Sequence, residues 1–205
     1  MEIFSYGYNE VDYLKKQDEQ LGAAINRIGF IEREIIPDLF TALVHSIVGQ
    51  QISAKAAVTV WNRLQQVCGT ITPQSIAEIA VTDIKQCGTS MRKAGYIKGI
   101  GEAVMQGQLK IDELPGLSDA EIIKRLSALH GVGVWTAEML LIFSMQRPDV
   151  VSWGDLAIRR GMMNLYGLQA LDKAEFARYR QRYSPYGSVA SLYLWRLAAE
   201  TAASE

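Results

Sequence analysis

A loop with two glycines carries the clearest functional pattern of this 205-residue chain. In "LHGVGVWTA", residues 129–137, Gly131 and Gly133 lack side chains, so backbone N–H groups can approach a ligand closely. A helix is expected to begin directly afterwards, and the first N–H groups of a helix lie unpaired at the positive end of its dipole. The loop therefore predicts an anion site, for example for a nucleic-acid phosphate. A simple turn between two helices with a glycine C-cap would give the same short pattern.

A single carboxylate, Asp155, is the second feature that could do chemistry. It stands directly before "LAIRRGMMNLYG", residues 156–167, which has the pattern of a helix. Aspartate is common at the N-cap of a helix, where its side chain accepts a backbone hydrogen bond. A fixed carboxylate can also stabilise a developing positive charge and orient or deprotonate a water molecule. The two roles are compatible.

The elements that must position these residues are predicted to be helices. Ser53 is expected to cap one helix, and Ser118 with Glu121 forms a capping-box pattern before another, which Gly131 should end. No convincing strand alternation, internal repeat or low-complexity linker is present. The main predicted helices cover residues 39–50, 54–69, 117–131, 135–145, 156–167 and 188–203.

Composition excludes several classes of protein. Hydrophobic residues make up 49% of the chain, and the net charge of −1 gives no general attraction to nucleic acid. The two cysteines, Cys68 and Cys87, are expected to be reduced thiols, and with only two histidines a zinc hydrolase is not expected. Neither a membrane span nor a signal peptide is apparent, so a soluble, cytoplasmic protein is expected.

Five sequence blocks, taken with their order along the chain, resemble one protein family. "LHGVGVWTA" is similar to the helix-hairpin-helix motif of base-excision DNA glycosylases, and "VVSWGDLAIRRG" to the catalytic-aspartate segment of the same superfamily. The other three resemble its 3-methyladenine DNA glycosylase II branch. They are "LVHSIVGQQISAKAA", "MRKAGYIKGIGEAV" and "YSPYGSVASLYLWRL".

The resemblance implies an all-α fold with two helical subdomains, a helix-hairpin-helix motif and an interdomain DNA-binding cleft. One subdomain would combine residues 1–39 and 151–205, and residues 40–150 would form the hairpin subdomain. The implied activity is hydrolysis of the N-glycosidic bond of alkylated purines, such as 3-methyladenine and 7-methylguanine, flipped out of duplex DNA. The expected partner is duplex DNA that contains alkylated bases, bound by a monomer and without a membrane.

The resemblance assigns the chemistry to Asp155, which would stabilise the oxocarbenium character of the deoxyribose. Bifunctional relatives carry a nucleophilic lysine where this chain has Trp135, which cannot form a Schiff base, so no lysine-dependent lyase activity is expected. An aromatic pocket would attract a cationic base. The candidate pocket residues are Trp135, Trp195 and Tyr193, for which core packing is the alternative, and Met139, which stands where a relative carries an aromatic residue.

Contacts to DNA are implied at two further places. Gln51, with Ile52 and Ser53 beside it, aligns with the residue that fills the gap left by the flipped base, and Gln50 is expected to stabilise that turn. Backbone contacts to phosphate are assigned to Gly131, Gly133, Val134 and Thr136. No cofactor is expected to be required for catalysis, but a structural Na⁺ or K⁺ could be held at the hairpin by the backbone carbonyls of Ser127, Leu129 and Val132.

Several points stay open from sequence. Arg92, Lys93 and Lys98 could add positive charge near phosphate or form a solvated face. His130 and Gly187 depart from the family pattern, which has proline and commonly arginine there. A glycosylase for ethenoadenine, hypoxanthine or uracil is the alternative enzyme. A helix-hairpin-helix DNA-binding module without catalysis is the alternative outside enzymes.

Overall fold

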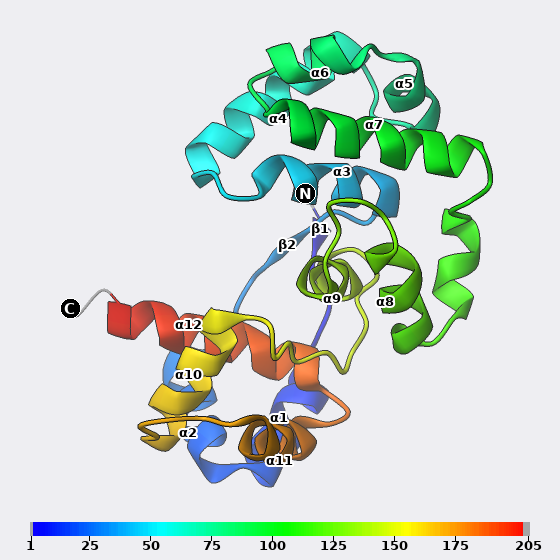
Figure 1. Ribbon diagram of the computed structural model, residues 1–205. Coiled ribbons are helices and arrows are strands. Elements are labelled where there is room, and N and C mark those ends of the chain that lie inside the picture. The colour runs from blue at the N-terminus through cyan, green and yellow to red at the C-terminus, as the bar shows by residue number, and fades with distance from the viewer. Residues whose placement is uncertain (1, 203–205) are drawn as a thin grey trace. The chain divides into compact units, whose positions relative to one another are not determined.

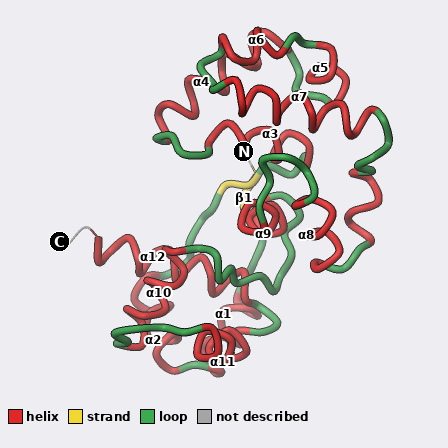
Figure 2. The backbone as a smooth tube through the Cα atoms, viewed as in Figure 1, coloured by secondary structure: helices red, strands yellow, loops and turns green. Residues whose placement is uncertain are grey.

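The computed structural model describes residues 2–202, and nearly all of its regular structure is helical (Figures 1 and 2). The predicted all-α class is therefore confirmed. Within these residues, no helix is long and apolar enough to cross a membrane. The elements, in chain order, are β1 (Glu2–Ile3), α1 (Tyr8–Gln17), α2 (Glu19–Ile28), β2 (Glu34–Ile35), α3 (Leu39–Gly49), α4 (Ala54–Cys68), α5 (Pro73–Glu78), α6 (Val81–Gln86), α7 (Met91–Met105), the 3₁₀ helix η1 (Ile111–Gly116), α8 (Asp119–Ser127), α9 (Val134–Phe143), α10 (Leu156–Tyr166), α11 (Lys173–Tyr183) and α12 (Gly187–Ala202).

The chain divides into two compact units. The middle unit contains residues 36–140, and the end unit combines residues 1–35 with residues 141–205. These limits differ from the predicted subdomain boundaries after residues 39 and 150. Residues 36–38 lead into α3 and belong with it. The last three residues of α9, from Leu141 to Phe143, and the loop that follows belong to the end unit.

In the middle unit, α7 is the central helix, and it packs against α3, α5 and α6. Its buried face includes Ala94, Ile97 and Ile100, which are at most 1% exposed. The crossing of α7 with α5 is close, because a Cβ added at Gly101 would lie 2.8 Å from Cγ2 of Ile76. Helix α7 therefore provides a fixed base for side chains that reach other parts of this unit.

In the end unit, the closest helix packing is between α10 and α12. A Cβ added at Gly161 of α10 would lie only 1.9 Å from the carbonyl oxygen of Leu194 in α12, so the crossing requires glycine. Helix α2 packs against both of these helices, and α1 packs against α2 and α11. The N-terminus of α10, where Asp155 lies, is thus attached to a well-packed helix.

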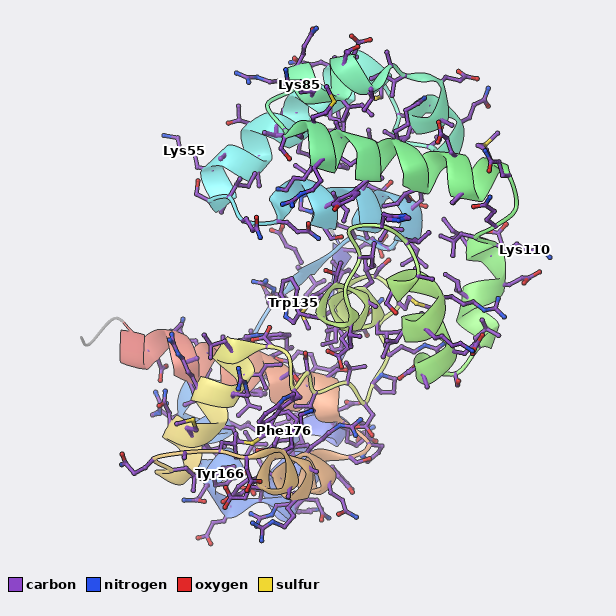
Figure 3. The ribbon with its side chains drawn as sticks, viewed as in Figure 1. Lys55, Lys85, Lys110, Trp135, Tyr166 and Phe176 are labelled. Carbon is purple, nitrogen blue, oxygen red and sulfur yellow. The ribbon has the colours of Figure 1, made fainter. Side chains whose placement is uncertain are left out.

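A buried polar cluster holds the other end of α10. The carboxylate of Asp18, 5% exposed, accepts hydrogen bonds from the Tyr166 hydroxyl at 2.7 Å and from Nη1 of Arg182 at 3.1 Å. The hydroxyls of Tyr166 and Tyr183 lie 2.8 Å apart, and burial raises the pKa of both tyrosines above the ordinary value. The tyrosines stay protonated, so the cluster joins α2, α10 and α11 by hydrogen bonds. Figure 3 labels Tyr166 in the end unit.

Short polar residues begin most of the helices. Ser53 accepts a hydrogen bond from the N–H of Ala56, as predicted, and such a cap stabilises a helix by about 1 kcal/mol. Ser118 likewise caps α8 by accepting from the N–H of Glu121. The Glu121 side chain pairs with Arg125 at 3.1 Å. The capping-box pattern therefore predicted the cap correctly, while the glutamate supports the helix through an i, i+4 ion pair.

Strands β1 and β2 and helix α11 were not expected from the sequence. Strands β1 and β2 form a two-stranded antiparallel sheet in which Glu2 pairs with Ile35 and Ile3 with Glu34. Two residues are too few to show an alternating pattern, so the sequence gives no signal for them. Helix α11 was also not predicted, because five of its eleven residues are charged and it buries only Phe176 and Tyr183. Residue 203, at the end of the last predicted helix, lies outside the described residues.

Candidate functional site

The glycine loop joins α8 to α9, and its two glycines have different structural roles. Gly131 has φ +87°, and a Cβ there would lie 2.3 Å from Cδ2 of Tyr96, on α7. Gly133 has no heavy atom within 4 Å of an added Cβ. Gly131 is therefore required by the fold of the loop, whereas Gly133 leaves open space beside the backbone. This space is what the close approach of a phosphate would need.

The first turn of α9 presents two large side chains to solvent. Val134 is 55% exposed and Trp135 is 46% exposed, whereas Thr136 is 4% exposed. Figure 3 labels Trp135. The first N–H groups of a helix have no partner within the helix, so this end can receive an anion. Thr136 is buried, which limits any contribution to phosphate binding to its backbone. Trp135 is accessible to a ligand, as a pocket residue must be.

The carbonyl oxygens assigned to a cation form a chemically suitable set. Backbone carbonyls of Ser127, Leu129 and Val132 are neutral, hard oxygen donors, which suit a monovalent ion better than a transition metal. The Leu129 carbonyl accepts a hydrogen bond from the N–H of Val132 at 3.2 Å, and a carbonyl oxygen has a second lone pair. The residues present therefore fit Na⁺ or K⁺. Within residues 2–202, no group of three or more histidine, cysteine, aspartate or glutamate residues could hold a metal ion.

The loop between α3 and α4 carries the residues assigned to the gap in the DNA. Gln51 is exposed and has φ +56°, a left-handed conformation that residues other than glycine rarely adopt. Ile52 is 40% exposed beside it, and the Ser53 hydroxyl caps α4. Gln50 donates a hydrogen bond from Nε2 to the carbonyl oxygen of Gly131 at 2.9 Å, so the loop is joined directly to the glycine loop. Gln50 thus stabilises this turn, as expected.

The three basic residues of α7 fall into two groups. Arg92 is exposed. Lys93 donates from Nζ to the carbonyl oxygens of Val48 and Gln50, and Lys98 donates to those of Ala77 and Ile79. Both lysines therefore bind the C-terminal ends of helices within the middle unit. This position makes them part of the scaffold, and only Arg92 keeps the character of a solvated cation.

Asp155 lies in the end unit and is almost completely buried. Its exposed fraction is 7%, and Oδ1 accepts a hydrogen bond from the N–H of Ile158 at 3.0 Å. The predicted N-cap role is confirmed. The cap fixes the carboxylate at the N-terminal, positive end of α10. Its catalytic role stays a prediction.

Serine side chains at the start of α12 fix the loop before Asp155. Ser188 accepts from the N–H of Val150 at 3.0 Å and donates to the carbonyl of Arg147 at 2.5 Å. Ser191 donates to the carbonyl of Val150 at 3.0 Å. Sequence reasoning missed these serines, because nothing local shows that they reach a loop nearly 40 residues away in the chain.

Arg159, one turn after Asp155, lies in aromatic surroundings that were not predicted from the sequence. Its guanidinium lies 4.8 Å from the ring centre of Trp153, and that ring packs edge-on against Phe176 at 5.2 Å. Nε of Arg159 is buried and has no hydrogen-bond partner. The guanidinium is therefore held by aromatic contact close to the catalytic candidate. The spacing of Trp153 and Arg159 around Asp155 was the available signal.

The aromatic candidates of the end unit have different environments. Trp195 is half-buried and lies 5.4 Å from the ring centre of Phe143, which also receives the guanidinium of Arg33 at 5.2 Å. Tyr193 is fully buried, and its hydroxyl donates to the carbonyl of Gly29 at 3.1 Å. This placement favours core packing for Tyr193. Met139, in the middle unit, is half-buried.

Comparison with known proteins connects these features to one family. Residues 44–185 match the HhH-GPD superfamily of base excision DNA repair proteins, and this range contains the glycine loop, the Gln51 loop and Asp155. The chain belongs to the HhH-GPD superfamily. The resemblance seen in the sequence is confirmed. Trp195 and Tyr193 lie beyond the matched range.

Two relatives of known structure match almost the whole chain, and a relative found by sequence matches about three quarters of it. DNA-3-methyladenine glycosidase from Bacillus halodurans is 37% identical, with a TM-score of 0.87 over 99% of this chain and 95% of that one. The 3-methyladenine DNA glycosylase Mag1 of Schizosaccharomyces pombe, in complex with abasic DNA, is 31% identical, with a TM-score of 0.80 over 92% and 95%. DNA-3-methyladenine glycosylase 1 of Schizosaccharomyces pombe is 34% identical over 162 residues, which are 77% of this chain and 71% of the relative.

Proposed function

We propose that the protein is a DNA glycosylase of base excision repair that hydrolyses the N-glycosidic bond of alkylated purines, such as 3-methyladenine and 7-methylguanine, in duplex DNA. The observation that carries the proposal is the buried, capped carboxylate of Asp155 in a chain of this superfamily. The names of the similar proteins support the choice of alkylated purines. We further propose that the protein acts as a monomer and needs no cofactor for catalysis.

The proposed role of Asp155 follows from the charge that develops during the reaction. As the bond to the base breaks, the deoxyribose gains oxocarbenium character, which a fixed negative charge stabilises. The same carboxylate can orient and deprotonate the attacking water. An N-alkylated purine carries a positive charge before the bond breaks and leaves as a neutral base. The enzyme therefore needs little help from a strong general acid at the leaving group.

The proposed DNA contacts follow the geometry of the middle unit. Backbone N–H groups of Gly131, Gly133, Val134 and Thr136 would receive a phosphate, and a Na⁺ or K⁺ on the neighbouring carbonyls would add positive charge there. Gln51, with Ile52 and Ser53, would fill the gap left by the flipped base. Exposed Trp135 would stack on a cationic base, with Met139 beside it on the same helix.

The proposal predicts release of free alkylated bases from damaged duplex DNA. Duplex DNA treated with a methylating agent is incubated with the protein, and the released bases are identified by chromatography. We expect 3-methyladenine and 7-methylguanine in the soluble fraction and an equal number of abasic sites in the DNA. Binding to the duplex without release of any base would contradict the proposal and support a binding module. Release of hypoxanthine or uracil alone would point to a different lesion.

We also expect the protein to lack lyase activity that depends on a lysine in the hairpin. Trp135 occupies the position where bifunctional relatives carry the nucleophilic lysine, and an indole cannot form a Schiff base with the sugar. The products from an end-labelled duplex with one lesion are separated before and after alkali. Strands should break only after alkali. Cleavage before alkali, or trapping of a covalent protein–DNA adduct by borohydride, would contradict this expectation.

A further inference from the structure

The backbone of Gln51 adopts a conformation that is unfavourable for residues other than glycine. Its φ of +56° lies in the left-handed region, and its exposed position gives it little packing of its own. A loop in this conformation needs contacts elsewhere that fix the neighbouring backbone. The contacts on the two sides of Gln51 show where this support comes from.

The first support is Lys93, at the start of α7. Its ammonium donates to the carbonyl of Val48 at 3.1 Å and to the carbonyl of Gln50, the residue directly before Gln51. These carbonyls lie at the negative C-terminal end of α3, where a cation is favourable. Lys93 is partly buried, and this burial lowers its pKa below the ordinary value. The ammonium therefore fixes the backbone that directly precedes Gln51.

The second support is the connection to the glycine loop. The Gln50 amide donates to the Gly131 carbonyl at 2.9 Å, and the Tyr96 ring lies against Gly131. Lys93 and Tyr96 are three residues apart on α7, so they lie on the same side of that helix. One face of α7 therefore supports both the Gln51 loop and the glycine loop, and Gln50 joins the two loops directly.

We propose that Lys93 is a positioning residue that keeps Gln51 oriented for insertion into the duplex, and that Gln50 couples this orientation to the phosphate-binding glycine loop. The inference rests on the proposed function, because it assumes that Gln51 fills the gap left by a flipped base. Lys93 itself need not touch DNA. Its effect should be confined to duplex substrates, because base flipping in a duplex leaves a gap opposite an unpaired base, and single-stranded DNA has no such gap.

The chain offers a matched control for this role. Lys98, five residues after Lys93 on α7, makes the same kind of contact with the carbonyls of Ala77 at 2.6 Å and Ile79 at 2.9 Å. Those carbonyls end α5, away from both loops in sequence. Replacement of either lysine by methionine removes an ammonium from a helix C-terminus and keeps most of the length of the side chain. Only Lys93→Met should affect insertion.

The experiment measures insertion without requiring catalysis. A duplex carries a tetrahydrofuran abasic analogue, with 2-aminopurine opposite it, and protein is added to saturation. The wild type should change the 2-aminopurine fluorescence, and Gln51→Gly should abolish this change. Lys93→Met should lose most of the change, Lys93→Arg should restore part of it, and Lys98→Met should match the wild type. Gln50→Met, which removes the hydrogen bond to Gly131, should also reduce the change and provides a second test if Lys93→Met folds poorly.

A second readout compares excision of alkylated bases from duplex and single-stranded DNA. Lys93→Met should lower duplex excision by about tenfold or more relative to single-stranded excision, because small displacements of positioning groups can cost up to about 100-fold. Equal loss on both substrates, or equal behaviour of Lys93→Met and Lys98→Met, would overturn the inference. So would a wild-type fluorescence change that Gln51→Gly retains, or no wild-type change at all. A wild type that changes the fluorescence but releases no base would overturn the proposed activity and not this inference.

Discussion

Replacement of Asp155 by asparagine is expected to lower the rate of base release by about two to four orders of magnitude with little change in stability. Oδ1 of Asp155 accepts the N–H of Ile158, and an asparagine Oδ1 can accept the same hydrogen bond. Aspartate and asparagine are equally good N-caps, so the substitution removes the charge and keeps the cap. Under the proposed mechanism, loss of the charge would remove the stabilisation of the oxocarbenium-like transition state.

The measurement is single-turnover release of 3-methyladenine, together with thermal unfolding of each variant. Asp172→Asn is the matched control, because Asp172 caps α11 in the same unit by accepting the N–H of Glu175 at 2.8 Å. It should keep the wild-type rate. Asp155→Ala should lose both the rate and about 1 kcal/mol of stability, because it removes the cap as well. Wild-type release by Asp155→Asn would show that another group performs the chemistry.

Features set by neighbouring residues could be predicted from the sequence. At Asp155, Ser53 and Ser118, the capping side chain accepts a hydrogen bond from the backbone N–H of the residue three positions later. The end of one helix and the start of the next around the glycine loop follow from the same local rules. The residues that form the candidate site could therefore be predicted from the sequence, but their surroundings could not.

Burial within α9 shows why the surroundings could not be predicted. The segment from Trp135 to Phe143 is apolar on nearly all sides, so its hydrophobic pattern does not distinguish a buried face from an exposed one. The structure exposes Val134 and Trp135 and buries Thr136. Tyr193, in α12, proves to be fully buried. Only packing against distant segments decides which of these side chains can meet a ligand.

Gly187 provides a second case in which a distant contact decides the residue. The resemblance to the family implies arginine at this position, and the local sequence gives no reason for glycine. In the structure, a Cβ here would lie 2.6 Å from Oδ1 of Asp149, which accepts the N–H of Gly187 at 3.1 Å. Oδ2 of Asp149 also accepts a hydrogen bond from the Ser184 hydroxyl at 2.6 Å. The loop before Asp155 thus uses backbone contacts at a place where a side chain would not fit.

The prediction with the largest effect on stability concerns Gly131. Gly131→Ala is expected to destabilise the fold by about 2–5 kcal/mol, from a left-handed backbone that disfavours alanine and from overpacking. Its Cβ would lie 2.3 Å from Cδ2 and 2.7 Å from Cγ of Tyr96, so the ring would have to move. Gly133→Ala meets no neighbour within 4 Å and should leave stability nearly unchanged.

The two variants should separate folding from DNA binding. Gly133→Ala should weaken binding to an abasic duplex by roughly tenfold, since a hydrogen bond to a charged group is worth about 1.5–3 kcal/mol and the methyl group would hold phosphate away from the backbone. Chemical denaturation and fluorescence anisotropy measure the two effects. In a Tyr96→Ala background, Gly131→Ala should cost less stability than it does in the wild type, because the clash with the ring is gone. Full binding by Gly133→Ala would show that phosphate does not approach at this residue, and wild-type stability of Gly131→Ala would show that the Tyr96 contact does not fix the loop.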